Sequence, residues 1–273
     1  DNKVPMFDFP NRVGPVLGAM WQYSEYIASK VGNFVDLKGI KKEQAKKIFN
    51  KHKNQTVIGE AGTRPVLAAY GIPLIQAEFA ESEKKAIELA SQIGFPLALK
   101  VISKEILHKS DAGGIKLDLH NIAETKKGIK EIMRSCKSYK PNARIDGVLV
   151  EKMAPAGREV IIGLKRDPNF GPLVMFGMGG IYVELLKDVA FRIVPLTEQE
   201  ATQMIEETFA GKLLQGYRGN PPADKKAIVD CILRLSQIAM DFPQIVEIEI
   251  NPLLVLPEGN GAIALDCRMI LNR

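Results

Sequence analysis

Apolar and polar positions recur along this chain with two periods, which divide most of it into helices and strands. In "SEKKAIELASQIG" the apolar residues have helical spacing, Ser82 can cap the start, and Gly94 with Pro96 ends the pattern. The same spacing predicts helices over 122–139 and about 223–240. Strand-like runs lie at 96–103, 114–120, 147–153, 159–166, 172–177, 245–250, 253–256 and 262–270.

The first residues do not follow these periods. "VPMFDFPNRVGPVL" contains three prolines and is expected to form an extended connector. A short apolar helix from about Ala19 to Lys30, with the only tryptophan, Trp21, should follow and could pack on a neighbouring domain or subunit. After Leu37 helices and strands alternate, which predicts an α/β protein with a strand-rich second half.

Composition narrows the class of protein without identifying a function. The 273 residues are 46% apolar and 25% charged, as in soluble globular proteins, and no apolar run is long enough for a membrane span. Three cysteines at unrelated spacings favour neither a disulfide framework nor a zinc site, so a reducing cytoplasm is expected. A net charge of +5 with only 7% aromatic residues gives weak support to nucleic-acid binding. The excess positive charge fits a polyphosphate ligand equally well, so composition alone decides neither.

Lys100 is unusual because it lies in the middle of the apolar run "PLALKVIS". Strand alternation places it on the face opposite Leu97 and Leu99. It can reach water if this strand is at a sheet edge, or it can be buried against an anion. The loop "HKSDAGGI" follows directly, and a lysine beside glycine amides that face outward is a recurring way to bind phosphates.

The C-terminal stretch "VEIEINPLLVLPEGNGAIALDCRM" reads as a β-hairpin with "PEGN" as its turn. A turn centred between Glu258 and Gly259 places Asn251 opposite Asp266 and Glu249 opposite Arg268. A few oxygen ligands gathered on an apolar hairpin suit Mg²⁺ bound together with phosphates. The alternative is a Glu249–Arg268 ion pair with Asn251 in a bend, which leaves Asp266 unexplained.

Other polar residues stand in the middle strands. Glu151 and Glu159 are surface carboxylates if each is taken alone. Arg192, between Phe191 and Ile193, resembles Lys100 as a cation in apolar sequence, and the glycines of "FGMGG" allow close backbone approach.

Taken in order, these stretches resemble the ATP-grasp subunit of NDP-forming acyl-CoA synthetases. The resemblance is strongest to the acetyl-CoA synthetase (ADP-forming) β subunit, or the equivalent C-terminal part of fused chains, and weaker to the succinyl-CoA synthetase β subunit. It extends from about Leu37 to the end and rests on "YGIPL", "PLALKVIS", "HKSDAGGI", "GREVIIGLKRDPNFGP", "FGMGGIYVELLKDVAFRIVPL" and "EIEINPLL". It implies an ATP-grasp fold in which two α+β lobes hold the nucleotide between them. The expected parts are a connector with a helix (1–37), an N-terminal part including the small lobe (38–150), and a C-terminal lobe with the Mg²⁺ and nucleotide site (151–273).

The resemblance also implies roles for single residues. Lys100 would contact the nucleotide phosphates, residues 108–114 would cover them, the strand around Glu151 would contact the adenine, and Glu159 would lie by the ribose. Asn251 and Asp266 match the Mg²⁺ ligands, and Glu249 matches a carboxylate that orients a phosphohistidine of the partner. The remaining residues counted with the ATP/ADP site are Lys109, Ser110, Gly113, Gly114, Met153 and Arg192.

His108 occupies the place of a histidine that is implicated in this family as a second phosphorylated residue. A neutral imidazole is a competent phosphoryl acceptor, and Asp111 is close enough in sequence to orient it. The implied overall reaction is acyl-CoA + ADP + phosphate ⇌ carboxylic acid + CoA + ATP. No CoA-binding domain is found in these residues, so a CoA-binding α subunit or fused domain carrying a phosphohistidine is the expected partner.

Two other functions fit the same pattern. A stand-alone ATP-grasp ligase that joins a carboxylate to an amine would need no partner and would have no specific use for His108. A non-catalytic nucleotide-sensing part of a larger protein is the other alternative. Formation of ATP from acyl-CoA, measured with and without a CoA-binding partner, separates these possibilities.

Overall fold

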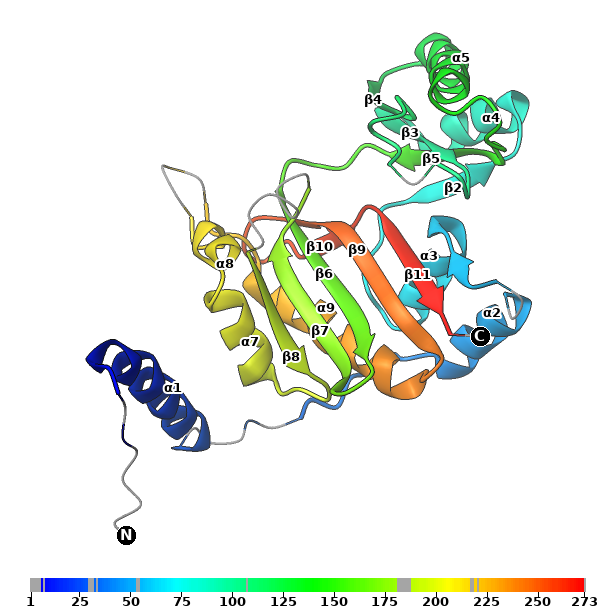
Figure 1. Ribbon diagram of the computed structural model, residues 1–273. Coiled ribbons are helices and arrows are strands. Elements are labelled where there is room, and N and C mark those ends of the chain that lie inside the picture. Colours follow the sequence, from blue (N-terminus) through cyan, green and yellow to red (C-terminus); the bar gives the residue numbers. More distant parts are fainter. Residues whose placement is uncertain are drawn as a thin grey trace.

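The chain forms two lobes and a separate N-terminal helix (Figure 1). The computed structural model describes residues 6, 8–28, 32, 34–52, 55–106, 108–180, 188–216, 219 and 221–272. A four-stranded sheet lies at the centre of the smaller lobe and a seven-stranded sheet at the centre of the larger one. The named strand pairs of both sheets are antiparallel.

The smaller lobe consists of one sheet and two helices. Its strands run in the order β2 (Ala77–Ala80), β5 (Gly147–Lys152), β3 (Leu97–Ile102) and β4 (Ile115–Leu119). The helices α4 (Glu83–Ile93) and α5 (Ile122–Tyr139) cover one face of this sheet. The bounds of β3, β4, β5, α4 and α5 lie within a residue or two of the predicted elements, whereas strand β2 is not among the predicted ones.

Local sequence explains where α4 begins and ends. Ser82 Oγ accepts a hydrogen bond from the backbone N–H of Lys85 at 3.2 Å, and Gly94 ends the helix at φ +78°. Leu97 and Leu99 of β3 pack into the core under α4 and α5, so Lys100 points to the other face of the sheet.

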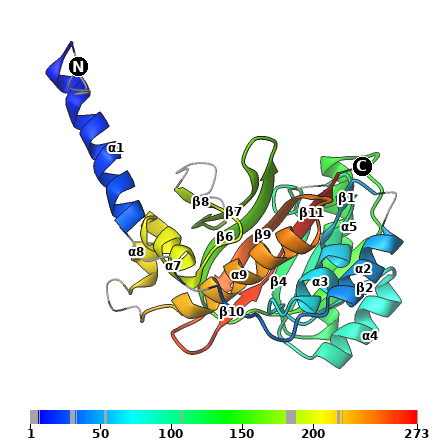
Figure 2. The ribbon, with the colours of Figure 1, turned by 90° about the horizontal axis from the view of Figure 1, so that it is seen from below.

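The larger lobe is a sheet with most of its helices on one face. Its strands run in the order β1 (Val57–Ile58), β11 (Cys267–Leu271), β9 (Ile245–Val255), β6 (Arg158–Asp167), β7 (Gly171–Met178) and β8 (Val189–Ile193), and β10 (Ala262–Ala264) pairs with β9. The helices are α2 (Lys42–Lys51), α3 (Glu60–Ala69), α7 (Glu198–Glu206), α8 (Phe209–Leu214) and α9 (Lys225–Asp241). Helix α9 lies across the sheet (Figure 2), and its Ile232 and Leu235 join Ile162 and Phe176 in the core.

The segment before the small lobe packs on the large one. Val57 of β1 pairs with Ile270 of β11, and Phe49 of α2 and Leu67 of α3 belong to the large-lobe core. The expected N-terminal part, 38–150, therefore contains a segment that packs on the large lobe as well as most of the small lobe. The chain enters the large lobe, leaves it to build the small lobe, and returns.

The N-terminal helix is longer than the sequence analysis expects. Helix α1 spans Pro10–Ala28, so residues 10–18 are helical and not an extended connector. Proline is tolerated in the first turn of a helix, and Val13, Val16 and Leu17 continue the apolar helical spacing backwards. The expected last residues, 29 and 30, lie outside the described part of the chain.

No helix in the described ranges is both long and apolar enough to cross a membrane. Cys136, Cys231 and Cys267 are free and buried.

Candidate functional site

The C-terminal hairpin has the register that the sequence predicts. Glu249 lies opposite Arg268, and its Oε2 accepts a hydrogen bond from Arg268 Nε at 2.6 Å. The backbone N–H of Asn251 donates to the carbonyl oxygen of Asp266 at 3.0 Å, so these two residues are cross-strand neighbours. The two strands expected at 245–250 and 253–256 form one continuous strand, β9, and the strand expected at 262–270 is divided into β10 and β11.

Asn251 also contacts the glycine-rich segment after β7. Its Oδ1 accepts a hydrogen bond from the N–H of Gly180 at 3.1 Å, and its Nδ2 lies 3.4 Å from Glu249 Oε1. A Cβ atom on Gly180 would lie 2.9 Å from Glu159 Oε2, and one on Gly179 would lie 2.7 Å from backbone atoms of residues 159 and 160. The glycines therefore bring the backbone against the oxygens of Asn251 and Glu159.

Lys100 is buried in a central strand, so the possibility that its strand is an edge strand is wrong. It lies on β3 between β4 and β5, and its Nζ is 2.9 Å from Glu151 Oε1. The same ammonium donates to the carbonyl oxygen of Leu265, in the large lobe, at 2.9 Å. Burial raises the pKa of Glu151, and the Lys100 charge opposes that shift. Lys100 thus has the anionic partner that a buried lysine requires, and it also joins the lobes.

Lys109 connects the loop after β3 to the large lobe through two carboxylates. Its Nζ lies 2.7 Å from Asp266 Oδ2 and 2.7 Å from Glu60 Oε2. Glu60 is only 4% exposed, and Arg64, one turn further along α3, lies 3.4 Å from its other oxygen. The cluster of Glu60, Lys109 and Asp266, called the junction triad below, lies where the two lobes meet.

Glu60 is the site residue that the sequence analysis missed. It stands in the first turn of α3, where a carboxylate is ordinary because it complements the helix dipole. A signal was present, because Glu60 shares a helical face with Thr63 and Leu67, both of which are buried. A carboxylate on the buried face of a helix needs a partner, and that requirement could have identified it.

The junction triad shifts the titration of its own members. Burial and the neighbouring charge of Asp266 raise the pKa of Glu60 to about 7, against the opposing effect of Lys109. Burial alone would raise the pKa of Asp266, but the charges of Lys109 and Lys100 and hydrogen bonds from the triad hold it below its ordinary value. Burial would lower the pKa of Lys109, but the two carboxylates raise it. Asp266 therefore ionises readily, whereas ionisation of Glu60 is unfavourable in the folded protein.

The loop 108–114 differs from the expected phosphate cradle. The N–H of Gly113 donates to the carbonyl of Ser110 at 3.0 Å, and that of Gly114 donates to the carbonyl of Lys109 at 2.8 Å. These amides are engaged within the loop and do not face outward. A Cβ atom on Gly114 would lie 2.4 Å from a methyl group of Val101, so this glycine is required for packing of the loop.

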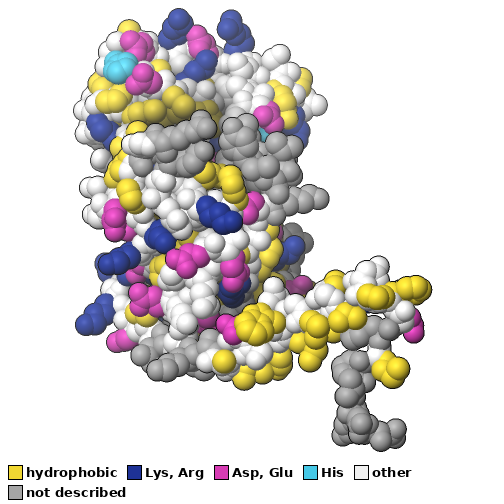
Figure 3. Space-filling model, turned by 90° about the vertical axis from the view of Figure 1, so that its left-hand side faces the viewer, with side chains coloured by type: hydrophobic (Ala, Val, Ile, Leu, Met, Phe, Trp, Pro, Cys, Tyr) yellow, Lys and Arg dark blue, Asp and Glu magenta, His cyan; other side chains and the backbone are white. Residues whose placement is uncertain are grey.

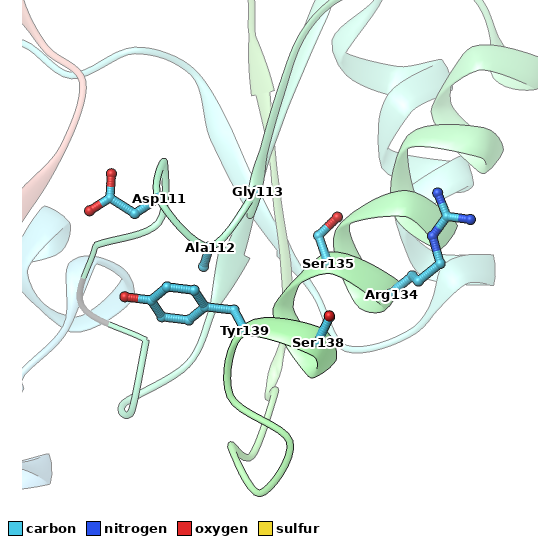
Figure 4. A pocket seen from close by; sticks show the side chains of 7 residues that line it. All are labelled: Asp111, Ala112, Gly113, Arg134, Ser135, Ser138 and Tyr139. Atoms are coloured by element: carbon cyan, nitrogen blue, oxygen red, sulfur yellow. The ribbon is translucent and has the colours of Figure 1, made fainter.

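The loop borders a shallow depression of about 530 Å³ beside α5. Figure 4 shows Tyr139 and Ser135 on the α5 side and Asp111 on the loop with its carboxylate turned outward. His108 is exposed. Both His108 and Asp111 belong to the described part of the chain, and no hydrogen bond joins the imidazole ring to the Asp111 carboxylate. The proposed orientation of His108 by Asp111 is therefore not present in this arrangement.

Two residues counted with the nucleotide site lie differently from the rest. The backbone N–H of Met153 donates to the carbonyl of Pro96, which keeps Met153 at the end of the strand that holds Glu151. Arg192 lies on β8, and its guanidinium pairs with Glu207, which follows α7. Because Arg192 alternates with the exposed Phe191, it is on the helix-covered face of the sheet, apart from the other site residues.

Comparison with known proteins agrees with the fold and the resemblance. A family model described as an ATP-grasp domain matches residues 50–271. The β subunit of acetate–CoA ligase (ADP-forming) I from Pyrococcus furiosus is 43% identical over 84% of this chain and 98% of the subunit. The ADP-forming 4-hydroxybutyrate–CoA ligase of Nitrosopumilus maritimus is 43% identical over 98% of this chain, which spans 39% of that relative.

A solved structure gives the same result in three dimensions. The acetyl-coenzyme A synthetase 1 of Ca. Korarchaeum cryptofilum, in complex with coenzyme A and Ca-AMPCP, has a TM-score of 0.80 and 42% identity, covering 84% of this chain and 100% of that chain. The expected ATP-grasp fold is thereby confirmed. This chain belongs to the ATP-grasp family that includes the β subunits of ADP-forming acetate–CoA ligases.

Proposed function

We propose that this chain is the nucleotide-binding part of an ADP-forming acyl-CoA ligase, which converts acyl-CoA, ADP and phosphate to a carboxylic acid, CoA and ATP. The observation that carries the proposal is the meeting of Lys100, Lys109, Asn251 and Asp266 at the junction of the lobes. A CoA-binding α subunit or fused domain would supply the acyl and CoA sites. Three free, buried cysteines suit a reducing cytoplasm as the location.

The donor groups at the junction fit Mg²⁺ and a polyphosphate. Asp266, with its lowered pKa, supplies a carboxylate, and Asn251 supplies an amide oxygen beside Glu249. These two residues would hold Mg²⁺, which offsets phosphate charge when bound. Lys109 pairs with Asp266, and Lys100 pairs with Glu151. We expect each ammonium group to turn towards a phosphate that enters the junction.

We assign phosphoryl transfer to His108. The imidazole is exposed and directly precedes Lys109, so a phosphohistidine on the partner can approach it. In the first step the N–P bond on the partner breaks as an N–P bond to His108 forms. In the second step that bond breaks as a β-phosphate oxygen of ADP bonds to phosphorus, giving ATP. Glu249, held by Arg268, would orient the incoming phosphohistidine.

A related structure supports this direction of approach. In one K. cryptofilum structure, with Mg-AMPPCP, the phosphohistidine segment points towards the nucleotide binding site. The alignment with this second structure of the protein gives 38% identity and a TM-score of 0.73. The observation concerns that protein, and it makes the same approach reasonable for the junction seen here.

Isotope labelling tests the proposal. The chain is incubated with [γ-³²P]ATP, Mg²⁺ and a CoA-binding partner, and both polypeptides should acquire acid-labile label. His108→Ala should remove the label from this chain and most ATP synthesis. The affinity for ADP should change little, because the His108 side chain is exposed and its removal should not disturb the packing of the loop. Asp266→Ala should instead weaken Mg²⁺-dependent ADP binding. Near-normal turnover of His108→Ala would exclude the transfer through His108.

A further inference from the structure

Helix α1 carries an apolar face that no described part of the chain covers. It projects from the body of the molecule (Figures 1 and 2), and apolar side chains follow it on the surface (Figure 3). Leu17 is 56% exposed, Met20 55%, Trp21 68% and Ile27 63%. Helical spacing places these four residues on one side, whereas Gln22 lies on the other.

Such a helix needs a protein surface to be stable. Isolated helices of this length are marginal in water, and α1 is weakened further by Gly14, Gly18 and the internal Pro15. Continuous exposed apolar surface also marks contact sites in soluble proteins. The charges of Arg12 and Glu25 on the helix cancel, so it lacks the basic residues that hold an amphipathic helix on an anionic membrane.

The comparisons show that a longer relative includes a counterpart of α1. The family model begins at residue 50, and the P. furiosus β subunit is matched over 98% of its own length while leaving part of this chain unmatched. The much longer N. maritimus ligase matches 98% of this chain, so its sequence includes a counterpart of α1. The helix thus accompanies the ATP-grasp part in a long ligase chain and is not required by the ATP-grasp fold itself.

We infer that the face of α1 formed by Leu17, Met20, Trp21 and Ile27 packs on an apolar surface of the CoA-binding part of the ligase. This inference rests on the proposed function, since it requires a CoA-binding partner. The helix then anchors the two parts to each other through a contact that lies outside the ATP-grasp lobes.

Cysteine reactivity tests this contact. The chain is co-expressed with a tagged version of the part of the N. maritimus ligase that it does not match, and the folding of that part is checked by CoA binding. Because the native cysteines are buried, Met20→Cys supplies an accessible thiol on the apolar face. In the co-purified complex its reaction with a maleimide should be slowed by roughly tenfold or more relative to the chain alone. Gln22→Cys, on the opposite face, is the matched control and should change little.

A second variant separates docking from folding. Trp21→Glu should prevent co-purification and leave the thermal unfolding of the chain unchanged, because the indole is exposed in the free chain. Three results would overturn the inference: an equally reactive Met20→Cys thiol in an assembled complex, a folded CoA-binding part that does not retain the chain, or self-association of the chain that Trp21→Glu abolishes.

The proposed function is judged by a different readout. A complex with a protected thiol but no acyl-CoA-dependent ATP formation contradicts the ligase activity and leaves the contact standing. A complex that makes ATP while the thiol stays reactive contradicts the α1 contact and leaves the ligase activity standing.

Discussion

Replacing Glu60 by glutamine should stabilise the protein at neutral and alkaline pH, although it removes a partner of Lys109. The carboxylate is almost fully buried, and its pKa is raised from 4.5 to about 7. Each unit of pKa shift corresponds to about 1.4 kcal/mol, so ionised Glu60 costs the folded state about 3 kcal/mol. Glutamine is isosteric and neutral and avoids that cost. The pKa of about 7 already includes the opposing effect of Lys109, so the expected gain is about 3 kcal/mol.

The pH dependence gives the sharper test of Glu60. Because the pKa is raised in the folded state, Glu60 keeps a proton there that it loses in the unfolded chain between pH 4.5 and about 7. Stability therefore falls as pH rises through this window, and the penalty is complete above it. The Glu60→Gln variant should lack this fall, so the two proteins should be similar near pH 5 and differ most near pH 8, by about 3 kcal/mol.

Urea unfolding followed by far-UV circular dichroism measures the effect, with EDTA present to exclude metal binding. Tryptophan fluorescence is unsuitable because Trp21, the only tryptophan, lies on the exposed helix α1. Glu88→Gln is the matched control, since this carboxylate pairs with Lys85 on the surface and its loss should change stability by less than about 0.5 kcal/mol. A less stable Glu60→Gln variant near pH 8, or an unchanged pH profile, would refute the argument that burial makes ionised Glu60 unfavourable in the folded protein.

Two further substitutions test the surroundings of the junction. Lys100→Met leaves Glu151 buried without a cation and should cost about 3 kcal/mol in a denaturation experiment, and Lys100→Met combined with Glu151→Leu should recover most of that loss. Gly114→Ala places a Cβ atom against Val101 and should lower the melting temperature through a loss of about 1–3 kcal/mol, which a compensating Val101→Ala change should reduce.

The part of the site that sequence predicts well is the part built by local rules. A turn signal and strand alternation are sufficient to set the hairpin register, so the pairing of Asn251 with Asp266 follows from the order of residues alone. Helix α4 is similar, because its cap and its terminating glycine are local features. Each of these predictions depends on residues that are near one another in the chain.

The remaining contacts depend on how distant segments meet. Glu60 and Asp266 approach Lys109 across 49 and 157 positions, and no local period specifies such a meeting. The outward-facing amides expected at Gly113 and Gly114 fail for a different reason. The loop closes its own hydrogen bonds because it must pack its glycines against β3 and α5. Composition shows that a loop is glycine-rich, but only packing shows what the glycines do.

The residues proposed to bind the nucleotide are the same ones that join the two lobes. The small lobe contacts the large one through Lys100, which donates to the carbonyl of Leu265, and through Lys109, which pairs with Asp266 and Glu60. These are the two cations assigned to the phosphates, and Asp266 is assigned to Mg²⁺. If these proposed assignments hold, phosphates and Mg²⁺ that engage these groups would replace the same bonds that join the lobes. Under the proposed function, nucleotide binding would therefore loosen the attachment of the loop that carries His108 to the large lobe.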